Sequence, residues 1–139
     1  MSLQELLSDL NIHYCAIIRN VAAKLNLTLS QAHHLLSIPH DGISMSDLST
    51  KIGLDASTLT RNIQGLERAG YVIRKQNMPD KRVSLVYLSK RGAYSQKIIE
   101  QDLESLIQKL LITVDLEKQE VLLGALEKFV WQIDCERLK

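Results

Sequence analysis

The sequence is poor in cysteine and in aromatic residues, and it has no long apolar run. Its two cysteines, Cys15 and Cys135, are too few and too far apart for a disulfide framework or a zinc finger. Aromatic residues make up 4% of the chain, which disfavours a stacking platform for single-stranded nucleic acid. No apolar run approaches the ~20 residues of a membrane span, and no signal-peptide pattern opens the chain. We therefore expect a cytoplasmic protein without a membrane partner.

The composition is otherwise that of a globular protein, with 45% hydrophobic and 24% charged residues, but the charge is unevenly distributed. Residues 51–97 contain ten Lys and Arg against three Asp and Glu, a net charge of +7, although the whole chain of 139 residues carries only +1. The rest holds seven basic and thirteen acidic residues, a net charge of −6. A basic middle between acidic flanks indicates a polyanionic partner for the middle, although a solvated charged face would have the same composition.

Three long amphipathic helices are predicted at the two ends of the chain. Leu, Ile and Val at three- and four-residue steps predict a helix over 3–25, another over about 90–112 and a last one over about 115–137 that begins at Asp115. The residues expected to be buried on the last two helices are Ile98, Leu103, Leu106, Ile107, Leu110, Leu111, Leu122, Leu126, Phe129, Val130 and Ile133.

Two capping patterns predict the starts of shorter helices. Thr28, with Gln31 three residues later, predicts a helix that ends before Pro39, because the residue preceding a proline disfavours helical backbone. Ser44, with Asp47 three residues later, predicts a further short helix. Both patterns supply acceptors for the free N–H groups of a first turn.

A helix-turn-helix is predicted next. Gly53 is expected to end the short helix in a left-handed conformation, and Asp55 is expected to cap a longer helix over about 56–69 that stops at Gly70. A short helix, a tight turn and a longer helix form the arrangement that places the second helix in the DNA major groove.

The pattern then changes to that of a β-hairpin. Val72–Lys75 and Val83–Leu88 are rich in β-formers, and residues 77–80 between them form a turn cluster. A basic hairpin directly after a helix-turn-helix is typical of a wing. The fold class is therefore predicted as mainly α with a small β-hairpin wing, a winged helix-turn-helix with long terminal helices.

The predicted helix over 56–69 has a polar side without acids. At about 100° per residue, Leu59, Ile63 and Leu66 point inward. Arg can bind a guanine edge and Gln an adenine edge, so such a face suits the major groove, whereas ordinary solvated faces usually mix both signs of charge. The residues on the outward side are Ser57, Thr60, Arg61, Gln64 and Arg68.

The hairpin tip carries a second group of basic residues. Lys81 and Arg82 follow the turn, where they can enter a minor groove or bind phosphates, and Asp80 can orient the Arg82 guanidinium. A purely structural Asp80–Arg82 pair is the alternative, and the two roles are compatible. The predicted DNA-binding residues are Ser46, Ser57, Thr58, Thr60, Arg61, Gln64, Lys75, Lys81 and Arg82.

These residues resemble the MarR/SlyA family of winged helix-turn-helix transcriptional regulators. The match runs from Ser44 to Val72 and continues in the wing as Asp80-Lys81-Arg82, followed by Leu88-Ser89-Lys90-Arg91-Gly92. The stretch from Asp80 to Gly92 has the spacing of the family's Asp-x-Arg … Leu-(Ser/Thr)-x-x-Gly signature, which is the most specific signal in the chain.

The resemblance implies a homodimer whose first and last helices intertwine and whose two reading helices bind a pseudopalindromic operator in double-stranded DNA. It implies one MarR-like domain over 1–139, with a winged core at about 28–92 and dimerisation helices at about 3–25 and 93–137. A winged core does not need these long helices for itself, so their apolar stripes also favour a dimer. The alternative is that they pack on one another within one chain.

The resemblance further implies a regulator, with repression as the expected mode, released by a small-molecule or oxidative signal. Cys15 is the candidate redox residue, although a small buried hydrophobe is the more frequent role of such a cysteine. His13 and His33 are candidates for an effector pocket, alongside a plain structural role. His33 and His34 are adjacent and point in different directions, so neither a metal site nor another cofactor is expected.

Two other functions are weighed against DNA regulation. A winged helix can bind a protein partner without touching DNA, and steep loss of duplex binding with added salt would separate the two. No nucleophile–base pair, phosphate-binding glycine loop or carboxylate pair is found, so an enzyme is not expected.

Overall fold

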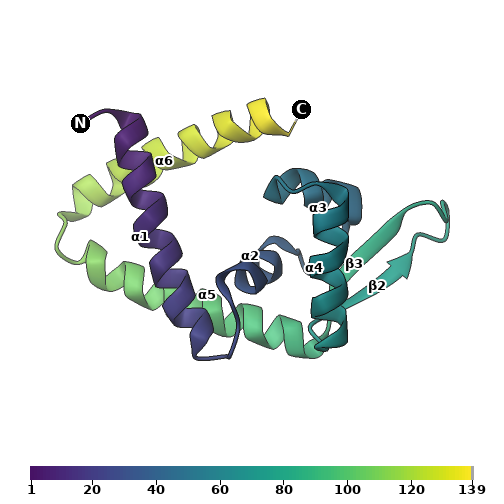
Figure 1. Ribbon diagram of the computed structural model, residues 1–139. Helices are drawn as coiled ribbons and strands as arrows, with labels where there is room; N and C mark the ends of the chain where they lie inside the picture. Colours follow the sequence, from purple (N-terminus) through teal and green to yellow (C-terminus); the bar gives the residue numbers. More distant parts are fainter. Residues whose placement is uncertain (139) are drawn as a thin grey trace. The chain divides into compact units, whose positions relative to one another are not determined.

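The computed structural model describes residues 1–138, which form six α-helices and three short strands (Figure 1). The mainly helical winged helix-turn-helix fold predicted from the sequence is confirmed. Lys139, the last residue of the predicted domain, lies outside the described residues. The elements are α1 (Leu3–Ala23), α2 (Leu29–Ser37), β1 (Ile43–Ser44), α3 (Met45–Ile52), α4 (Ala56–Arg68), β2 (Val72–Gln76), β3 (Ser84–Leu88), α5 (Lys90–Leu111) and α6 (Leu116–Arg137).

The chain divides into two compact units. The first extends from Met1 to Leu103 and contains the helix-turn-helix and the wing, and the second begins at Glu104 and contains α6. Within residues 1–138, no helix combines the length and the apolar character needed to cross a bilayer.

The helix starts follow the sequence closely. At α2, Thr28 and Gln31 form the expected reciprocal capping box. At α3, Ser44 accepts from the Asp47 N–H at 3.0 Å, a single bond rather than the reciprocal pair that the sequence pattern suggested. Gly53 ends α3 with φ 82°, the left-handed conformation that a residue with a Cβ adopts at a cost. These caps fix where the helix-turn-helix begins and turns.

The wing belongs to a three-stranded antiparallel sheet of order β1-β3-β2. The hairpin pairs Val72 with Leu88 at its base and Gln76 with Ser84 near its tip, and it extends as an arm beside α4 (Figure 1). Strand β1 was not predicted, because two residues are too few to produce an alternating pattern. Its pairing of Ile43 with Val86 joins the start of the helix-turn-helix to the wing.

The core lies entirely in the first unit. Its largest fully buried side chains come from α2, α3, α4, β3 and α5, and they surround the helix-turn-helix. Helix α1 contributes only its C-terminal half to this core. Its N-terminal Leu3, Leu6 and Leu10 are more than half exposed. The fully buried residues are Leu35, Ile38, Leu48, Leu59, Ile63, Leu66, Val86 and Ile99.

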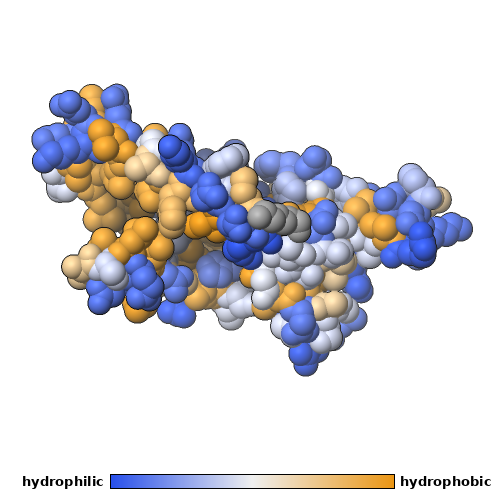
Figure 2. All heavy atoms as spheres, turned by 90° about the horizontal axis from the view of Figure 1, so that it is seen from above, coloured by the Kyte–Doolittle hydropathy of each residue, from blue (hydrophilic) through white to orange (hydrophobic). Residues whose placement is uncertain are grey.

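The second unit does not bury the apolar residues that the sequence analysis expected. Leu103 is buried in the first unit, but Leu106 and Leu110 are exposed, and α6 has no buried residue. Leu126 and Val130 of α6 are 39% and 52% exposed. The helices are placed correctly, but their apolar residues beyond Leu103 are not buried in the single chain. Figure 2 shows hydrophobic side chains (orange) reaching the molecular surface.

Candidate nucleic-acid interface

Asp55 organises the first turn of α4. Its carboxylate accepts from the Thr58 N–H at 2.8 Å, the Ser57 hydroxyl at 2.7 Å and the Thr58 hydroxyl at 2.8 Å. These bonds, the Thr58 N–H above all, lower the pKa of Asp55 to about 2. The predicted cap is confirmed, and it uses the hydroxyl hydrogens of two predicted DNA-binding residues. Their oxygens keep lone pairs that can accept from a base amino group.

The outward side of α4 presents free donors. Arg61, Gln64 and Arg68 are exposed, and within residues 1–138 none of the three forms a hydrogen bond or ion pair with another residue. Thr60 is half-buried, and its hydroxyl donates to the Ala56 carbonyl at 2.8 Å. Of the predicted α4 set, Arg61 and Gln64 are therefore the side chains with uncommitted N–H donors for a base edge.

Polar contacts hold both flanks of the buried stripe of α4. On one flank, Glu67 accepts from Arg74 of β2 through Nε at 3.3 Å and Nη2 at 3.1 Å. On the other flank, the Asn62 amide nitrogen lies 3.2 Å from Nε2 of His34 in α2. The stripe between these flanks, Leu59, Ile63 and Leu66, is at most 2% exposed.

The C-terminal end of α4 is held by the residues that precede and begin α5. The Ser89 hydroxyl donates to the Gly70 carbonyl at 2.6 Å, and Arg91 donates to the Ala69 carbonyl at 2.7 Å. The Arg91 guanidinium also lies 4.4 Å from the centre of the Tyr71 ring, within cation–π range. These bonds satisfy carbonyls that a helix end leaves without partners.

Gly92 permits this close approach. A Cβ at Gly92 would collide with the Tyr71 carbonyl, a backbone atom that cannot move aside cheaply. The Gly92 N–H donates to the Ser89 hydroxyl at 3.0 Å, which in turn holds the end of α4. The Leu88-Ser89-Lys90-Arg91-Gly92 run thus has a physical role: it locks α4 to α5.

The wing tip carries the predicted acid–base pair. Asp80 accepts from Arg82 through Nε at 3.1 Å, Nη2 at 3.3 Å and the backbone N–H at 3.1 Å. These bonds, the side-chain ones first, lower the pKa of Asp80. Lys81 and Arg82 are exposed, and the arm is covered mostly by hydrophilic residues (blue at the right of Figure 2).

Lys75 occupies a different face of the wing. Its ammonium lies 5.4 Å from the centre of the Tyr87 ring. Its neighbour Arg74 contacts Glu67 of α4, and successive side chains of a strand point to opposite faces. Lys75 therefore lies on the sheet face turned away from α4. It is not grouped with Arg61 and Gln64, the outward donors of that helix.

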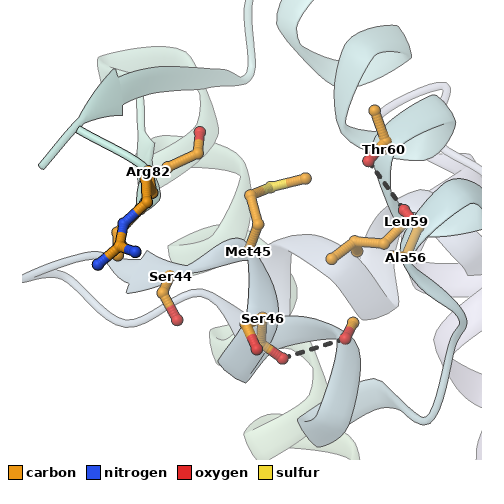
Figure 3. Close-up of a pocket in the computed structure, with 10 residues that line it drawn as sticks. Ser44, Met45, Ser46, Ala56, Leu59, Thr60 and Arg82 are labelled. Atoms are coloured by element: carbon orange, nitrogen blue, oxygen red, sulfur yellow. Dashed lines mark hydrogen bonds between the residues drawn. The ribbon is translucent and has the colours of Figure 1, made fainter. Parts of the chain in front are cut away.

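A groove lies between α3, α4 and residues 82–84 of the wing (Figure 3). It has a volume of about 390 Å³, and its lining combines five hydroxyl-bearing residues and Arg82 with apolar side chains such as those of Met45 and Leu59. Figure 3 shows Met45 and Ser46 of α3 between the wing residue Arg82 and the α4 residues Leu59 and Thr60. Ser46 is exposed here, as a phosphate-binding residue must be. The hydroxyl residues are Ser44, Ser46, Ser49, Thr60 and Ser84.

The candidate effector and redox residues, His13, His33 and Cys15, do not line this groove. His13 is exposed on α1, and His33 of α2 is half-buried, with its pKa lowered by burial and by neighbouring His34. The half-buried Cys15 thiol donates to the Asn11 side-chain oxygen at 3.5 Å, a contact that brings no positive charge to the sulfur. Within residues 1–138, no cluster of His, Cys, Asp and Glu could hold a metal ion. The effector and redox roles stay predictions.

Known proteins that resemble this chain in sequence and in fold include transcriptional regulators. Residues 27–84 match the MarR family. The HTH-type transcriptional regulator YdgJ of Bacillus subtilis is 31% identical over 88 residues, which cover 63% of this chain and 54% of that protein. The crystal structure of wild-type apo MarR from E. coli superposes with a TM-score of 0.79 at 27% identity, covering 93% of this chain and 96% of that one. The chain is therefore similar to MarR-family proteins, in sequence over residues 27–84 and in fold over most of its length.

A second MarR-family structure bears on the interface. A mutant MarR from E. coli complexed with operator DNA matches with a TM-score of 0.75 and 27% identity, covering 91% of this chain and 92% of that one. The chain spans about half the length of the curated relative it matches in sequence.

Three residues that position α4 in the structure were not predicted from the sequence. Asn62 was assigned to neither side of the predicted helix, and His34 was considered only as part of a candidate metal cluster. Arg91 was noted in the signature without a role. A signal for Asn62 existed, because a short amide at the edge of an apolar stripe commonly has a buried partner. Its partner lies 28 residues away in the sequence, which no local pattern reveals.

Proposed function

We propose that this protein is a cytoplasmic, homodimeric transcriptional regulator that binds a pseudopalindromic operator in double-stranded DNA and represses transcription. The observation that carries the proposal is the outward side of α4, where Arg61 and Gln64 have free donors on a helix held at both ends and on both flanks. The complex of a related MarR with operator DNA supports it. Binding DNA, rather than catalysis, is the role proposed.

In this proposal the contacts divide by type. Arg61 and Gln64 read base edges in the major groove, where forked donors discriminate between base pairs. Beside Arg61 and Gln64, three hydroxyl residues accept hydrogen bonds from the DNA or contact it directly: Ser57, Thr58 and Thr60. Lys81 and Arg82 bind the adjacent minor groove or its phosphates, and Asp80 fixes the Arg82 guanidinium. Ser46, at the start of α3, contacts the backbone, and Lys75 contributes only long-range attraction.

The homodimer forms through α6. Leu122, Leu126, Val130 and Ile133 lie on one side of this helix and are 47%, 39%, 52% and 36% exposed in the single chain. An apolar side of this extent rarely remains in water, and a twofold interface of identical chains covers it on both partners at once. A dimer also supplies two reading helices, as two half-sites require.

We further propose that a chemical signal releases the protein from DNA. The resemblance to the MarR family favours a small-molecule or oxidative signal, with His13 and His33 as candidate effector contacts and Cys15 as the candidate redox residue. Duplex binding measured with and without peroxide, in wild type and in Cys15→Ala, tests the oxidative route. Equal loss of binding in both proteins would remove Cys15 from the proposal.

The experiment that tests the function is selection of bound sequences from random duplexes. We expect a pseudopalindrome with half-sites about one helical turn apart. Arg61→Ala is expected to relax the preference at one position, at a cost of about 1–3 kcal/mol for the selected duplex. Lys81→Ala is expected to weaken binding to all sequences and to reduce the slope of log affinity against log salt by about 1. Enrichment of no sequence by the wild type would contradict the proposal.

A further inference from the structure

Two polar contacts hold α4 from different elements of the first unit. Asn62 contacts His34 of α2, and Glu67 contacts Arg74 of β2. His34 is 2% exposed, so water competes little for the first contact. The Arg74 side chain is 30% and the Glu67 side chain 38% exposed, so the second is partly shielded.

The hydrogen bonds of His34 define its tautomer. Its Nδ1 lies 2.6 Å from the Ser30 carbonyl oxygen, which can only accept, so Nδ1 carries the hydrogen. In the neutral imidazole Nε2 is then an acceptor, and the Asn62 amide donates to it at 3.2 Å. The ring is held by α2 itself, and it presents one directed lone pair to α4.

The two contacts lie on opposite sides of the apolar stripe. At about 100° per residue, Asn62 and Glu67 are about 140° apart around the helix axis, with the Leu59–Ile63–Leu66 stripe between them. On the same wheel, Arg61 lies almost diametrically opposite the middle of that arc. Apolar packing is non-directional and permits small rotations of a helix, whereas hydrogen bonds on both flanks oppose rotation in either direction.

We propose that the Asn62–His34 and Glu67–Arg74 contacts set the rotation of α4 about its axis and thereby determine how strictly the protein discriminates DNA sequences. Asn62 is a positioning residue: it acts through the direction in which Arg61 and Gln64 point. The inference rests on the proposed DNA-binding function. It separates discrimination from affinity, because phosphate contacts by the wing carry no sequence information.

The test compares two duplexes, the sequence selected by the wild type and a scrambled duplex of the same composition. In Asn62→Ala, we expect the ratio of the two affinities to fall about tenfold, the size of one lost forked base contact. Affinity for the scrambled duplex and its salt dependence should stay at the wild-type values. Wild-type discrimination by a folded Asn62→Ala protein would overturn the inference.

A second helix position separates positioning from stability. Gly65 lies between Asn62 and Arg61 around α4, about 60° from Asn62, and an added Cβ there would meet nothing within 4 Å. Gly65→Ala should raise the melting temperature, because alanine favours the helix interior, and its discrimination should match the wild type. The double variant Asn62→Ala with Gly65→Ala should regain melting temperature but not discrimination. Recovery of discrimination together with stability would overturn the inference and make Asn62 merely structural.

Glu67→Gln provides an independent variant should Asn62→Ala fail to fold. It keeps one acceptor for Arg74 and removes the charge, so we expect a smaller loss of discrimination in the same direction. Unchanged discrimination in Glu67→Gln, with Asn62→Ala unfolded, would overturn the inference. A wild type that selects no sequence would overturn the proposed function as well, whereas a selective wild type with equally selective variants would overturn only this inference.

Discussion

The winged helix-turn-helix segment and α6 are both rich in leucine, isoleucine and valine, yet they use these residues differently. In the winged segment, side chains such as Leu35, Leu48 and Ile63 are fully buried within the chain itself. In α6, Leu122, Leu126 and Val130 stay exposed, and no residue of the helix is buried. The first region buries these residues in its own core, and the second leaves them exposed in the single chain.

The polar residues repeat this contrast. Around α4, side chains and backbone carbonyls are paired across four elements, through His34, Arg74, Ser89 and Arg91. In α6, the cap residue Asp115 makes no side-chain cap bond and its carboxylate lies 4.0 Å from Lys118, whereas Gln119 donates to the nearby Leu111 and Val114 carbonyls at 2.8 and 2.7 Å. A helix that must point its side chains accurately is held by directed bonds. The bonds of Gln119 in α6 reach carbonyls at most eight residues away in the sequence, whereas the Asn62–His34 bond of α4 spans 28 residues.

The largest effect should come from filling the space at Gly92. We expect Gly92→Ala to destabilise the winged segment by about 3 kcal/mol or more, since the added Cβ meets the Tyr71 carbonyl rather than a side chain that can turn away. Thermal unfolding and duplex binding both report on it. If the Gly92→Ala protein had wild-type stability, the backbone at the α4–α5 junction would be able to move away from the added Cβ. The close packing of Gly92 against the Tyr71 carbonyl would then contribute little to stability.

A charged residue on the apolar side of α6 should weaken the proposed dimer. Leu126→Asp is expected to raise the dissociation constant of the dimer about tenfold or more, because it places an unpaired carboxylate in the proposed apolar interface. Sedimentation at several protein concentrations measures this change.

The matched control lies in the winged core. Ile63→Val should lower stability by about 0.5–1.5 kcal/mol and do so equally at every protein concentration. A wild-type chain that stays monomeric at all concentrations would contradict the proposed role of α6.

A smaller effect concerns the cap of α4. Because the folded pKa of Asp55 is lowered from 3.8 to about 2, its charge contributes stability that is fully present above pH 3.8 and is lost as the pH falls toward 2. Asp55→Asn keeps a capping oxygen but not the charge. The stability advantage of the wild type should therefore be constant near neutral pH and shrink between pH 4 and pH 2. An advantage independent of pH would show that the charge of Asp55 does not contribute.

Local chemistry explains which parts of the fold could be predicted. The Thr28, Gly53 and Asp55 boundaries follow from bonds within a few residues, and the inward and outward sides of α4 follow from helical periodicity. The Asp80–Arg82 pair spans only two residues and was predicted for the same reason.

The features that escaped prediction depend on distant partners. Strand β1 exists because Ile43 and Ser44 pair with β3, about 40 residues later in the chain. The Asn62–His34 contact depends on how α2 packs against α4. For the terminal helices, the apolar periodicity correctly predicted helices but not burial, since a stripe identifies a side that requires cover without identifying what covers it.

The smallest expected effect tests how much of α6 a partner covers. Gly124 lies within α6, about 160–180° around the helix from Leu122, Leu126 and Ile133, and in this chain an added Cβ would meet nothing within 4 Å. We expect Gly124→Ala to stabilise the protein by up to about 1 kcal/mol, because alanine restricts the unfolded chain and favours the helix, and to leave dimer dissociation unchanged. Denaturation and sedimentation of the same variant separate the two quantities. A weaker dimer would instead mean that the partner approaches the Gly124 side as well, so that α6 is enclosed rather than covered on one side.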